Sequence, residues 1–311
     1  MHSILIDEPI EQVKKMQRKT RRQKHKWKKT LTNKWTILII SSILVAALLV
    51  YFFVFSSTTA VYEAIPHTAA IIDQLSLTHP NATFIENVEK TLTSANFTVD
   101  YYNYSQITVD FYRQLPSKRY SLIILRVHSG IGQYSGLTSF YTSENYSDWA
   151  HYWEQTNKEV VAVDYVQNGP TYFAITSNFV KASDTCKNST VIMMGCDGLN
   201  KTDMAEAFVE KGAKVYIGWD GPISPEHTDK ATEQLLSNIV SKNQTIGEAI
   251  ENTMKTVGSD PNYYQSRLTY YPLEAENYVI TTSNSALDTN QYSLLRLVTL
   301  IVATNIDRSM V

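Results

Sequence analysis

Residues 122–130 read LIILRVHSG and residues 190–198 read TVIMMGCDG. Each stretch is a short, mainly apolar run that leads into a histidine or a cysteine with glycine within two positions. Runs of this kind are typical of strands that are buried on both faces of a parallel sheet. The two stretches therefore predict core strands over 122–127 and 190–194, and His128 and Cys196 follow their carboxyl ends.

Other apolar runs alternate with helical stretches on both sides of these two strands. The remaining core strands are predicted over 69–73, 97–102 and 213–218. Helices are predicted over 80–95, 109–115, 203–210, 226–241 and 245–257. Strands that alternate with helices indicate right-handed βαβ units and a parallel sheet.

The middle of the chain, residues 131–189, has a different composition. It is rich in Gly, Tyr, Ser and Thr, and its short β-like runs lie at 138–142, 160–165 and 172–180. The turn sequence Asn168-Gly169-Pro170 separates the last two runs. We therefore expect β-hairpins inserted into an α/β core.

Composition excludes several classes of protein. The 311 residues are 43% hydrophobic and 19% charged, which is too apolar for a disordered chain. Two cysteines are too few for a disulfide scaffold or a cysteine-rich zinc module. Residues 1–35 hold 11 of the 28 Lys and Arg but 3 of the 30 acids, so 17 bases and 27 acids remain, a net charge of −10. An acidic body argues against nucleic acid as a partner.

Residues 36–55, TILIISSILVAALLVYFFVF, contain neither charge nor proline. Twenty residues at a rise of ~1.5 Å span the ~30 Å hydrocarbon core of a bilayer. The alternatives are a buried core helix and a cleaved signal peptide. Core helices seldom stay uncharged for so long, and no small-residue cleavage site ends the run cleanly. The segment therefore predicts one transmembrane helix in contact with membrane lipid.

The basic cluster before this segment predicts which side of the membrane each part faces. Lys and Arg are enriched in cytoplasmic flanks, so we expect residues 1–35 to be a cytoplasmic tail. Residues 56–67 follow as a linker, and residues 68–311 form an extracytoplasmic domain, with 294–303 as its final core element. All seven N-x-S/T glycosylation sequons lie after the apolar segment, at Asn81, Asn96, Asn103, Asn145, Asn188, Asn200 and Asn243. This distribution fits a glycoprotein of the cell membrane that exposes its folded domain to the outside.

The histidine and cysteine at the two strand ends have complementary chemistry. Ligands of an open parallel sheet bind beyond the carboxyl ends of its strands. If the two strands are neighbours, an imidazole and a thiol emerge at the same edge, where the imidazole can take the thiol proton. Glycines near both residues leave backbone N–H groups available to hold an oxyanion. A buried structural cysteine and a structural histidine are the alternative interpretation of the same residues.

These motifs resemble those of the caspase–gingipain–legumain superfamily of cysteine peptidases. The resemblance covers about residues 68–260, and the stretch MAEAFVEKGAKVYIGW, 204–219, is similar to the gingipain- and clostripain-like branch. It implies a doubly wound core, no metal and no organic cofactor, and a protein or peptide substrate. It further implies that Cys196 is the nucleophile, that His128 is the general base, and that backbone N–H groups of Ser129, Gly130 and Cys196 hold the oxyanion.

Two positions depart from the pattern of that superfamily. Ser129 stands between His128 and Gly130, where many members have glycine directly after histidine. Asp197 follows Cys196, and a carboxylate there raises the pKa of the thiol. A catalytically silent surface domain that binds a partner is therefore the alternative function, and another hydrolase or acyltransferase reaction is a third.

The residues that select a substrate are less evident from the sequence. Asp220 follows the strand that ends at Gly218, and it is a candidate for receiving a basic side chain; a solvated loop acid is the alternative. Trp219 is a candidate for lining the cleft or for filling the core. Cys186 is not expected to bridge Cys196, because a strand between them holds them roughly 20 Å apart, beyond the ~7 Å that a disulfide allows.

Overall fold

The computed structural model describes residues 67–165 and 168–280, together with Leu38, Ser41, Ser42 and Val45. The chain divides into two units, residues 1–64 and residues 65–311. The tail 1–35, the rest of the apolar segment 36–55, most of the linker and the run 294–303 lie outside the described residues. Among the residues that are described, no helix combines the length and the apolar character needed to cross a bilayer.

The folded unit is built on a six-stranded sheet in the order β10-β9-β8-β3-β1-β2. Its strands are β1 (Thr68–Asp73), β2 (Thr98–Asn103), β3 (Leu122–Arg126), β8 (Thr190–Met193), β9 (Val215–Trp219) and β10 (Leu268–Tyr271). The first five are parallel, and β10 runs antiparallel to β9. The chain proceeds outward from β1 to one edge and from β3 to the other, so the order of the strands reverses between β1 and β3. This is a doubly wound sheet with its topological switch point at that pair.

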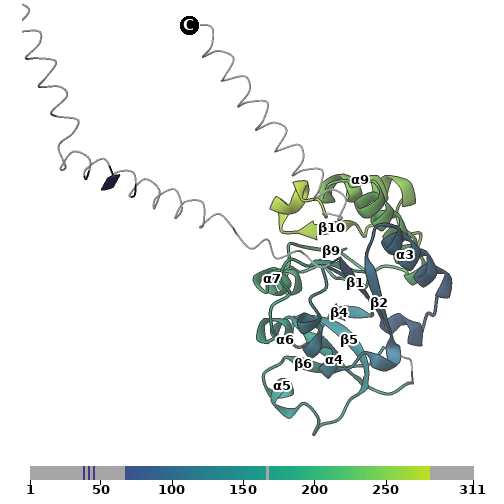
Figure 1. Ribbon diagram of the computed structural model, residues 1–311. Helices are drawn as coiled ribbons and strands as arrows, with labels where there is room; N and C mark the ends of the chain where they lie inside the picture. The colour runs from purple at the N-terminus through teal and green to yellow at the C-terminus, as the bar shows by residue number, and fades with distance from the viewer. Residues whose placement is uncertain (1–37, 39–40, 43–44, 46–66, 166–167, 281–311) are drawn as a thin grey trace, which may run out of the picture. The chain divides into compact units, whose positions relative to one another are not determined.

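Helices cover both faces of the sheet, as Figure 1 shows. One face packs against α3 (Ala82–Ser94), α8 (Pro225–Leu236) and α9 (Ile246–Val257). The other packs against α4 (Val109–Gln114), α6 (Ser177–Ala182) and α7 (Asp203–Glu210). Because both faces are covered, every residue of β3 and β8 is buried. This explains why these strands are apolar throughout and do not alternate.

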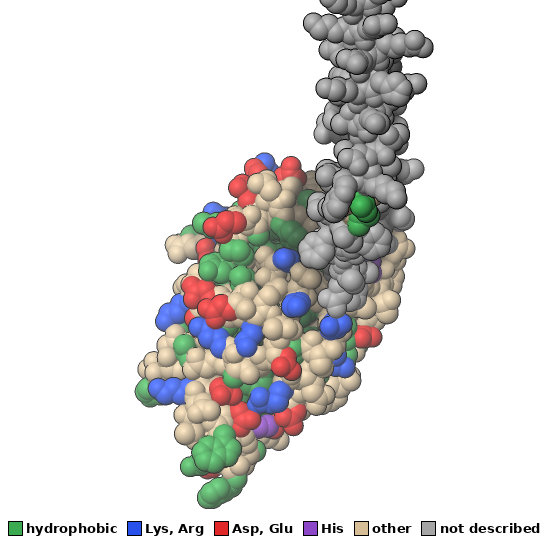
Figure 2. Space-filling view, turned by 60° about the vertical axis from the view of Figure 1, so that its left-hand side comes forward, with side chains coloured by type: hydrophobic (Ala, Val, Ile, Leu, Met, Phe, Trp, Pro, Cys, Tyr) green, Lys and Arg blue, Asp and Glu red, His purple; other side chains and the backbone are tan. Residues whose placement is uncertain are grey.

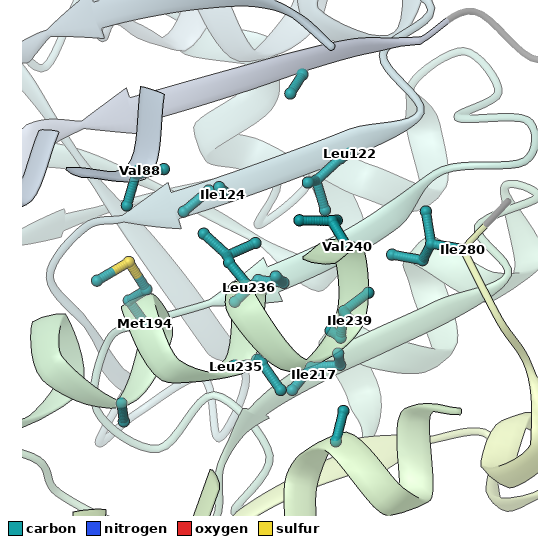
Figure 3. Packing of buried hydrophobic residues seen from close by; sticks show 14 of the residues in the cluster. Val88, Leu122, Ile124, Met194, Ile217, Leu235, Leu236, Ile239, Val240 and Ile280 are labelled. Carbon is teal, nitrogen blue, oxygen red and sulfur yellow. The ribbon is translucent and has the colours of Figure 1, made fainter. Parts of the chain in front are cut away.

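Side chains of β3 alternate between the two cores. Leu122 and Ile124 point toward α3 and α8, and Figure 3 shows them beside Val88, Leu236 and Val240. The intervening residues, Ile123 and Leu125, belong to the core on the other face. The period of two places Arg126 on the same face as Ile124, at the carboxyl end of the sheet.

The region 131–189 forms a second sheet, as the composition predicts. Its antiparallel strands lie in the order β4-β5-β7-β6, with bounds β4 (Ser129–Ile131), β5 (Thr138–Asn145), β6 (Val160–Val163) and β7 (Tyr172–Thr176). The strand predicted over 172–180 is wrong beyond residue 176. The hydroxyl group of Thr176 accepts a hydrogen bond from the backbone N–H of Asn178, and this cap starts α6.

Several elements have no counterpart in the sequence prediction. They are β4, β10, the short helix α5 (Tyr152–Thr156) and the 3-10 helices η1 (Gln74–Leu77), η2 (Tyr104–Gln106), η3 (Leu115–Lys118) and η5 (Leu273–Asn277). The helix predicted over 226–241 is formed by α8 and one following turn of π-helix, η4 (Ser237–Ser241). Ser224 precedes α8 without capping it, because its hydroxyl group bonds to Asp260.

Acidic and basic side chains are interspersed over the face of the folded unit shown in Figure 2. No side-chain cluster of three or more His, Cys, Asp or Glu in the described part of the chain has a metal-binding arrangement.

Candidate active site

His128 and Cys196 lie beyond the carboxyl ends of two strands that pair directly. In the parallel ladder of β3 and β8, Leu125 is the partner of Met193. The backbone N–H of Met194 then donates to the carbonyl oxygen of Leu125 at 2.9 Å, so the pairing continues past the strand. His128 and Cys196 each follow the last pair by three residues. The condition on which the sequence argument depended, that the two strands are neighbours, is confirmed.

The segments that follow the two strands are also in contact. The hydroxyl group of Ser129 donates a hydrogen bond to the carbonyl oxygen of Cys196. A Cβ atom added at Gly195 would overlap the carbonyl oxygen of Val127 and the hydroxyl oxygen of Ser129. Glycine at position 195 is thus required by the close approach of the two chains.

The imidazole of His128 is held by residues that follow β1. Its Nε2 atom is 3.0 Å from the hydroxyl oxygen of Thr78. Its backbone N–H donates to Oε1 of Gln74 at 2.9 Å. Burial, with a smaller contribution from the positive charges of His79 and Arg126, lowers the pKa of His128 to about 4. The imidazole is therefore neutral at neutral pH and can accept a proton.

Two tyrosines flank the His128 ring on the side of the second sheet. The ring centroids of Tyr165 and Tyr141 lie 5.0 and 6.2 Å from that of His128. Burial raises the pKa of Tyr141, and the charges of Cys196 and Asp197 raise it further. Tyr141 thus interacts with both predicted catalytic residues, and no pattern in the sequence distinguishes it among the chain's 20 tyrosines.

Cys196 has a free thiol, and so does the buried Cys186, as the sequence argument predicts. The Sγ atom of Cys196 accepts a hydrogen bond from the backbone N–H of Ile223 at 3.4 Å and donates to the carbonyl oxygen of Ile223 at 3.6 Å. Burial raises the pKa of Cys196, the Ile223 N–H lowers it, and the carboxylate of Asp197 raises it. The effect expected of Asp197 is confirmed, and the thiol is protonated at neutral pH.

No hydrogen bond joins the thiol of Cys196 to the imidazole of His128. Each has another partner, Ile223 for the sulfur and Thr78 for Nε2. Both groups are electrically neutral in this arrangement. Nucleophilic attack from this state requires proton transfer from the thiol as the new bond forms, since no thiolate is present beforehand. The catalytic dyad stays a prediction.

The predicted oxyanion donors lie in two different segments of the backbone. Ser129 and Gly130 are in β4, where they are the partners of Phe140 and Ser139 of β5. The backbone N–H of Cys196, in contrast, lies at the turn after β8. Their joint action on an oxyanion stays a prediction.

The two predicted substrate-binding residues have structural partners. The indole of Trp219 is 1% exposed, and its N–H donates to the hydroxyl group of Thr228 at 3.0 Å. Asp220 is exposed, but its Oδ1 atom accepts the backbone N–H of Arg267 at 2.6 Å. Trp219 therefore fills the core and Asp220 fixes a neighbouring loop, while contact of either with a substrate stays a prediction.

A buried ion-pair network joins β1, β3 and α8. Arg126 is 1% exposed and bonds Asp229 of α8 through Nε and Nη2, at 2.7 and 2.8 Å. Its Nη1 atom bonds Asp73 of β1 at 2.7 Å. Asp73 and Arg126 end the two strands of the switch point, so this network fixes their carboxyl ends relative to α8.

Sequence reasoning overlooked the contribution of β1 to the site. Gln74, Thr78 and His79 follow the apolar run AAIID, 69–73, which is the third strand to end at this edge. The rule that selected His128 and Cys196, polar residues after buried parallel strands, also selects this segment. The partner of the sulfur, Ile223, could not be selected because a backbone group makes the contact.

No family model matches the chain, and no curated protein matches its sequence. The solved structures that match include the crystal structure of gingipain R (RgpB), an Arg-specific cysteine proteinase. The match covers 71% of this chain and 49% of that one, with 12% sequence identity and a TM-score of 0.47. The chain thus spans about half the length of that structure. A similarity at this level assigns neither a family nor a substrate.

Proposed function

We propose that this chain is a membrane-anchored cysteine peptidase with a fold of the caspase–gingipain–legumain type. One observation carries the proposal: β3 and β8 pair directly at the centre of the sheet, and His128 and Cys196 follow their ends in matching register. The bond between Ser129 and Cys196 holds the two segments together. A thiol and a neutral imidazole at the switch-point edge are the components that nucleophilic catalysis requires.

In the proposed reaction, the thiol proton of Cys196 passes to the neutral imidazole of His128 as Sγ attacks the carbonyl carbon of a peptide bond. Backbone N–H groups of Ser129, Gly130 and Cys196 hold the oxyanion. The tetrahedral intermediate collapses as the imidazolium returns its proton to the leaving amine, and a thioester remains on Cys196. Water, deprotonated by His128, then hydrolyses the thioester and restores the thiol.

The membrane anchor is part of the same proposal. The uncharged run 36–55 is long enough to cross a bilayer, and the basic tail 1–35 orients its amino end toward the cytoplasm. The folded domain then lies outside the cell, where the sequons are accessible to glycosylation. Protease treatment of sealed, right-side-out vesicles of the cell membrane tests this orientation. Added protease is expected to digest the folded domain, and protection of that domain would contradict the proposed orientation.

A non-catalytic binding domain is the second candidate, and one observation favours it. The sulfur of Cys196 bonds to Ile223 and not to the imidazole, and burial raises the pKa of the thiol. Both features reduce nucleophilicity. The peptidase therefore requires rotation of the Cys196 side chain toward His128 as substrate binds.

Alkylation and peptide hydrolysis by the full-length protein in detergent distinguish the two candidates. The peptidase predicts pH-dependent alkylation of Cys196 that is lost in His128→Ala, with Cys186 unlabelled. It also predicts hydrolysis of members of a peptide library that is abolished in Cys196→Ala and retained in Cys186→Ala. Absence of hydrolysis, with binding of a protein partner unaffected in Cys196→Ala, would instead support the binding domain.

A further inference from the structure

A single hydroxyl group connects two histidines at the site. The Oγ1 atom of Thr78 lies 3.0 Å from Nε2 of His128 and 3.0 Å from Nδ1 of His79. The two imidazole rings lie 6.0 Å apart, edge to face. His79 is exposed to solvent, whereas His128 is largely buried.

The segment that carries the hydroxyl group is firmly positioned. The backbone N–H groups of Thr78 and His79 both donate to the carbonyl oxygen of Leu75, at 3.0 and 2.6 Å. The carbonyl oxygen of His79 accepts from Nη2 of the buried Arg126 at 2.9 Å. The turn that carries Thr78 and His79 is therefore tied by hydrogen bonds to η1 and to the buried Arg126.

A hydroxyl group has one proton, so it cannot donate to both rings. When His79 is protonated, its Nδ1–H donates to Thr78, and the hydroxyl proton points to Nε2 of His128. Neutral His128 then carries its proton on Nδ1. When His79 is neutral and its Nδ1 accepts the hydroxyl proton, Nε2–H of His128 donates to Thr78, and Nδ1 of His128 has a free lone pair.

We propose that His79 is a positioning residue that controls the tautomer of His128 through the hydroxyl group of Thr78, so that protonation of His79 prevents His128 from acting as a base. This inference rests on the proposed function, which it deepens by adding regulation by pH. Nδ1 of His128 makes no hydrogen bond within the described residues, and it is the nitrogen left to receive the thiol proton. It can receive that proton only in the tautomer that neutral His79 permits.

The other ionisable groups around His128 keep one charge state in the range where histidines ordinarily titrate, pH 5 to 8. Arg126 on β3 is paired with two carboxylates and stays positive. Burial raises the pKa of Tyr141 on β5, and it raises the pKa of Tyr165, after β6, to about 12. The thiol of Cys196 also has a raised pKa. His79 differs from these groups in sharing the hydroxyl group of Thr78 with His128.

The tautomer of His128 can be observed directly in full-length protein labelled with ¹⁵N-histidine. The ¹⁵N shifts of His128 are expected to change from the Nδ1–H to the Nε2–H pattern as His79 loses its proton. Thr78→Ser, which keeps the hydroxyl group, is expected to retain this change, and Thr78→Val is expected to lose it. His67→Gln, a substitution of another histidine away from the site, should have no effect. A tautomer of His128 that is independent of pH in the wild type, or a change that persists in Thr78→Val, would overturn the proposal.

A second measurement connects the tautomer to reactivity. Loss of thiolate lowers the alkylation rate of Cys196 in every variant as the pH falls, so the rate of the wild type is divided by that of His79→Ala at each pH. This ratio is expected to fall toward acid pH, because protonated His79 keeps His128 from acting as a base while His128 itself stays neutral to about pH 4. A ratio that does not depend on pH would contradict the proposal. If the wild type hydrolyses no peptide while the tautomer still follows His79, the peptidase fails and the coupling between the histidines stands.

Discussion

The hydroxyl group of Ser129 donates to the carbonyl oxygen of Cys196, and this bond joins the two segments that hold the predicted catalytic residues. Ser129 is also the residue that separates His128 from Gly130. It connects the segment after β3 to the segment after β8.

Substitution Ser129→Ala should weaken that connection. The loss of one hydrogen bond to a partly buried carbonyl group is expected to lower the free energy of unfolding by about 0.5–1.5 kcal/mol. It should also change the alkylation rate of Cys196, because the backbone of Cys196 is no longer held. Ser183→Ala is the matched control, since Ser183 makes a similar bond to the carbonyl oxygen of Phe179 away from the site. A comparable change of alkylation rate in the control would argue against a specific role of Ser129.

Substitution Gly195→Ala should separate the two strand ends. The added methyl group overlaps backbone and side-chain atoms of Val127 and Ser129, and overpacking of this kind costs about 1–3 kcal/mol. Chemical denaturation measures the cost. Gly258→Ala is the comparison for backbone strain without overlap, because position 258 has open space and a side chain there is opposed by the backbone conformation alone, with φ 74° and ψ −165°. If Gly195→Ala is as stable as the wild type, the close approach is not required.

Substitution Asp229→Asn should destabilise the fold strongly. It removes one partner of the buried Arg126, and breaking a buried ion pair on one side typically costs about 3–5 kcal/mol. Thermal and chemical denaturation would report the loss. Glu251→Gln breaks the exposed pair of Glu251 with Lys255 and should have no measurable effect. Equal stability of the two variants would contradict a structural role for the buried network.

The low pKa of His128 predicts a specific dependence of stability on pH. The unfolded histidine takes up a proton near pH 6.5, whereas the folded one does so at about pH 4. Between these values the unfolded state binds more protons, so the contribution of His128 to stability is lost as the pH falls. At about 1.4 kcal/mol per pKa unit, the loss is on the order of 3 kcal/mol. The free energy of unfolding of the wild type should therefore fall relative to that of His128→Gln as the pH falls from 6.5 to 4. Curves of this free energy against pH that run parallel for the two proteins would exclude the effect.

Sequon use should follow the hydrogen bonds of the asparagine side chains, if the domain is exported as proposed. Asn81 caps α3 through its Oδ1 atom and donates from Nδ2 to Asp229, so a glycan on this nitrogen would break the fold. Asn96, Asn145 and Asn243 are exposed. Glycopeptide mapping should therefore find glycans among these three and none at Asn81. Occupancy of Asn81 in folded protein would contradict the structure.

Much of the central sheet could be predicted because its strands are buried on both faces. The apolar runs at β3 and β8 and the alternation with helices identified their positions, and the helix over 203–210 matches α7. His128 and Cys196 followed from the rule that parallel strands end at one edge. These features depend on local composition, which the sequence carries directly.

Features that depend on distant partners could not be predicted in this way. β4 contains only Ser-Gly-Ile and exists because β5 pairs with it, and β10 is fixed by β9. The bond between Arg126 and Asp229 joins residues far apart in the chain. The partner of the Cys196 sulfur is a backbone group of Ile223, which side-chain chemistry does not reveal. Tertiary contacts, rather than local preference, decide these positions.

The second sheet lies entirely between His128 and Cys196 in the chain, yet it supplies no residue to the ladder between β3 and β8. The turn at Gly132–Gly136 is closed by backbone hydrogen bonds from Gly132 to Leu137 and from Gly136 to Gly132, and Nζ of Lys201 donates to the carbonyl oxygen of Gly136 at 2.7 Å. A foreign peptide grafted into this turn, or new chain ends opened there by circular permutation, should therefore leave the pairing of β3 with β8 in place. The pairing of the two strands is in this sense independent of the length of this turn, which makes the turn, rather than the sheet that flanks it, a place for insertions.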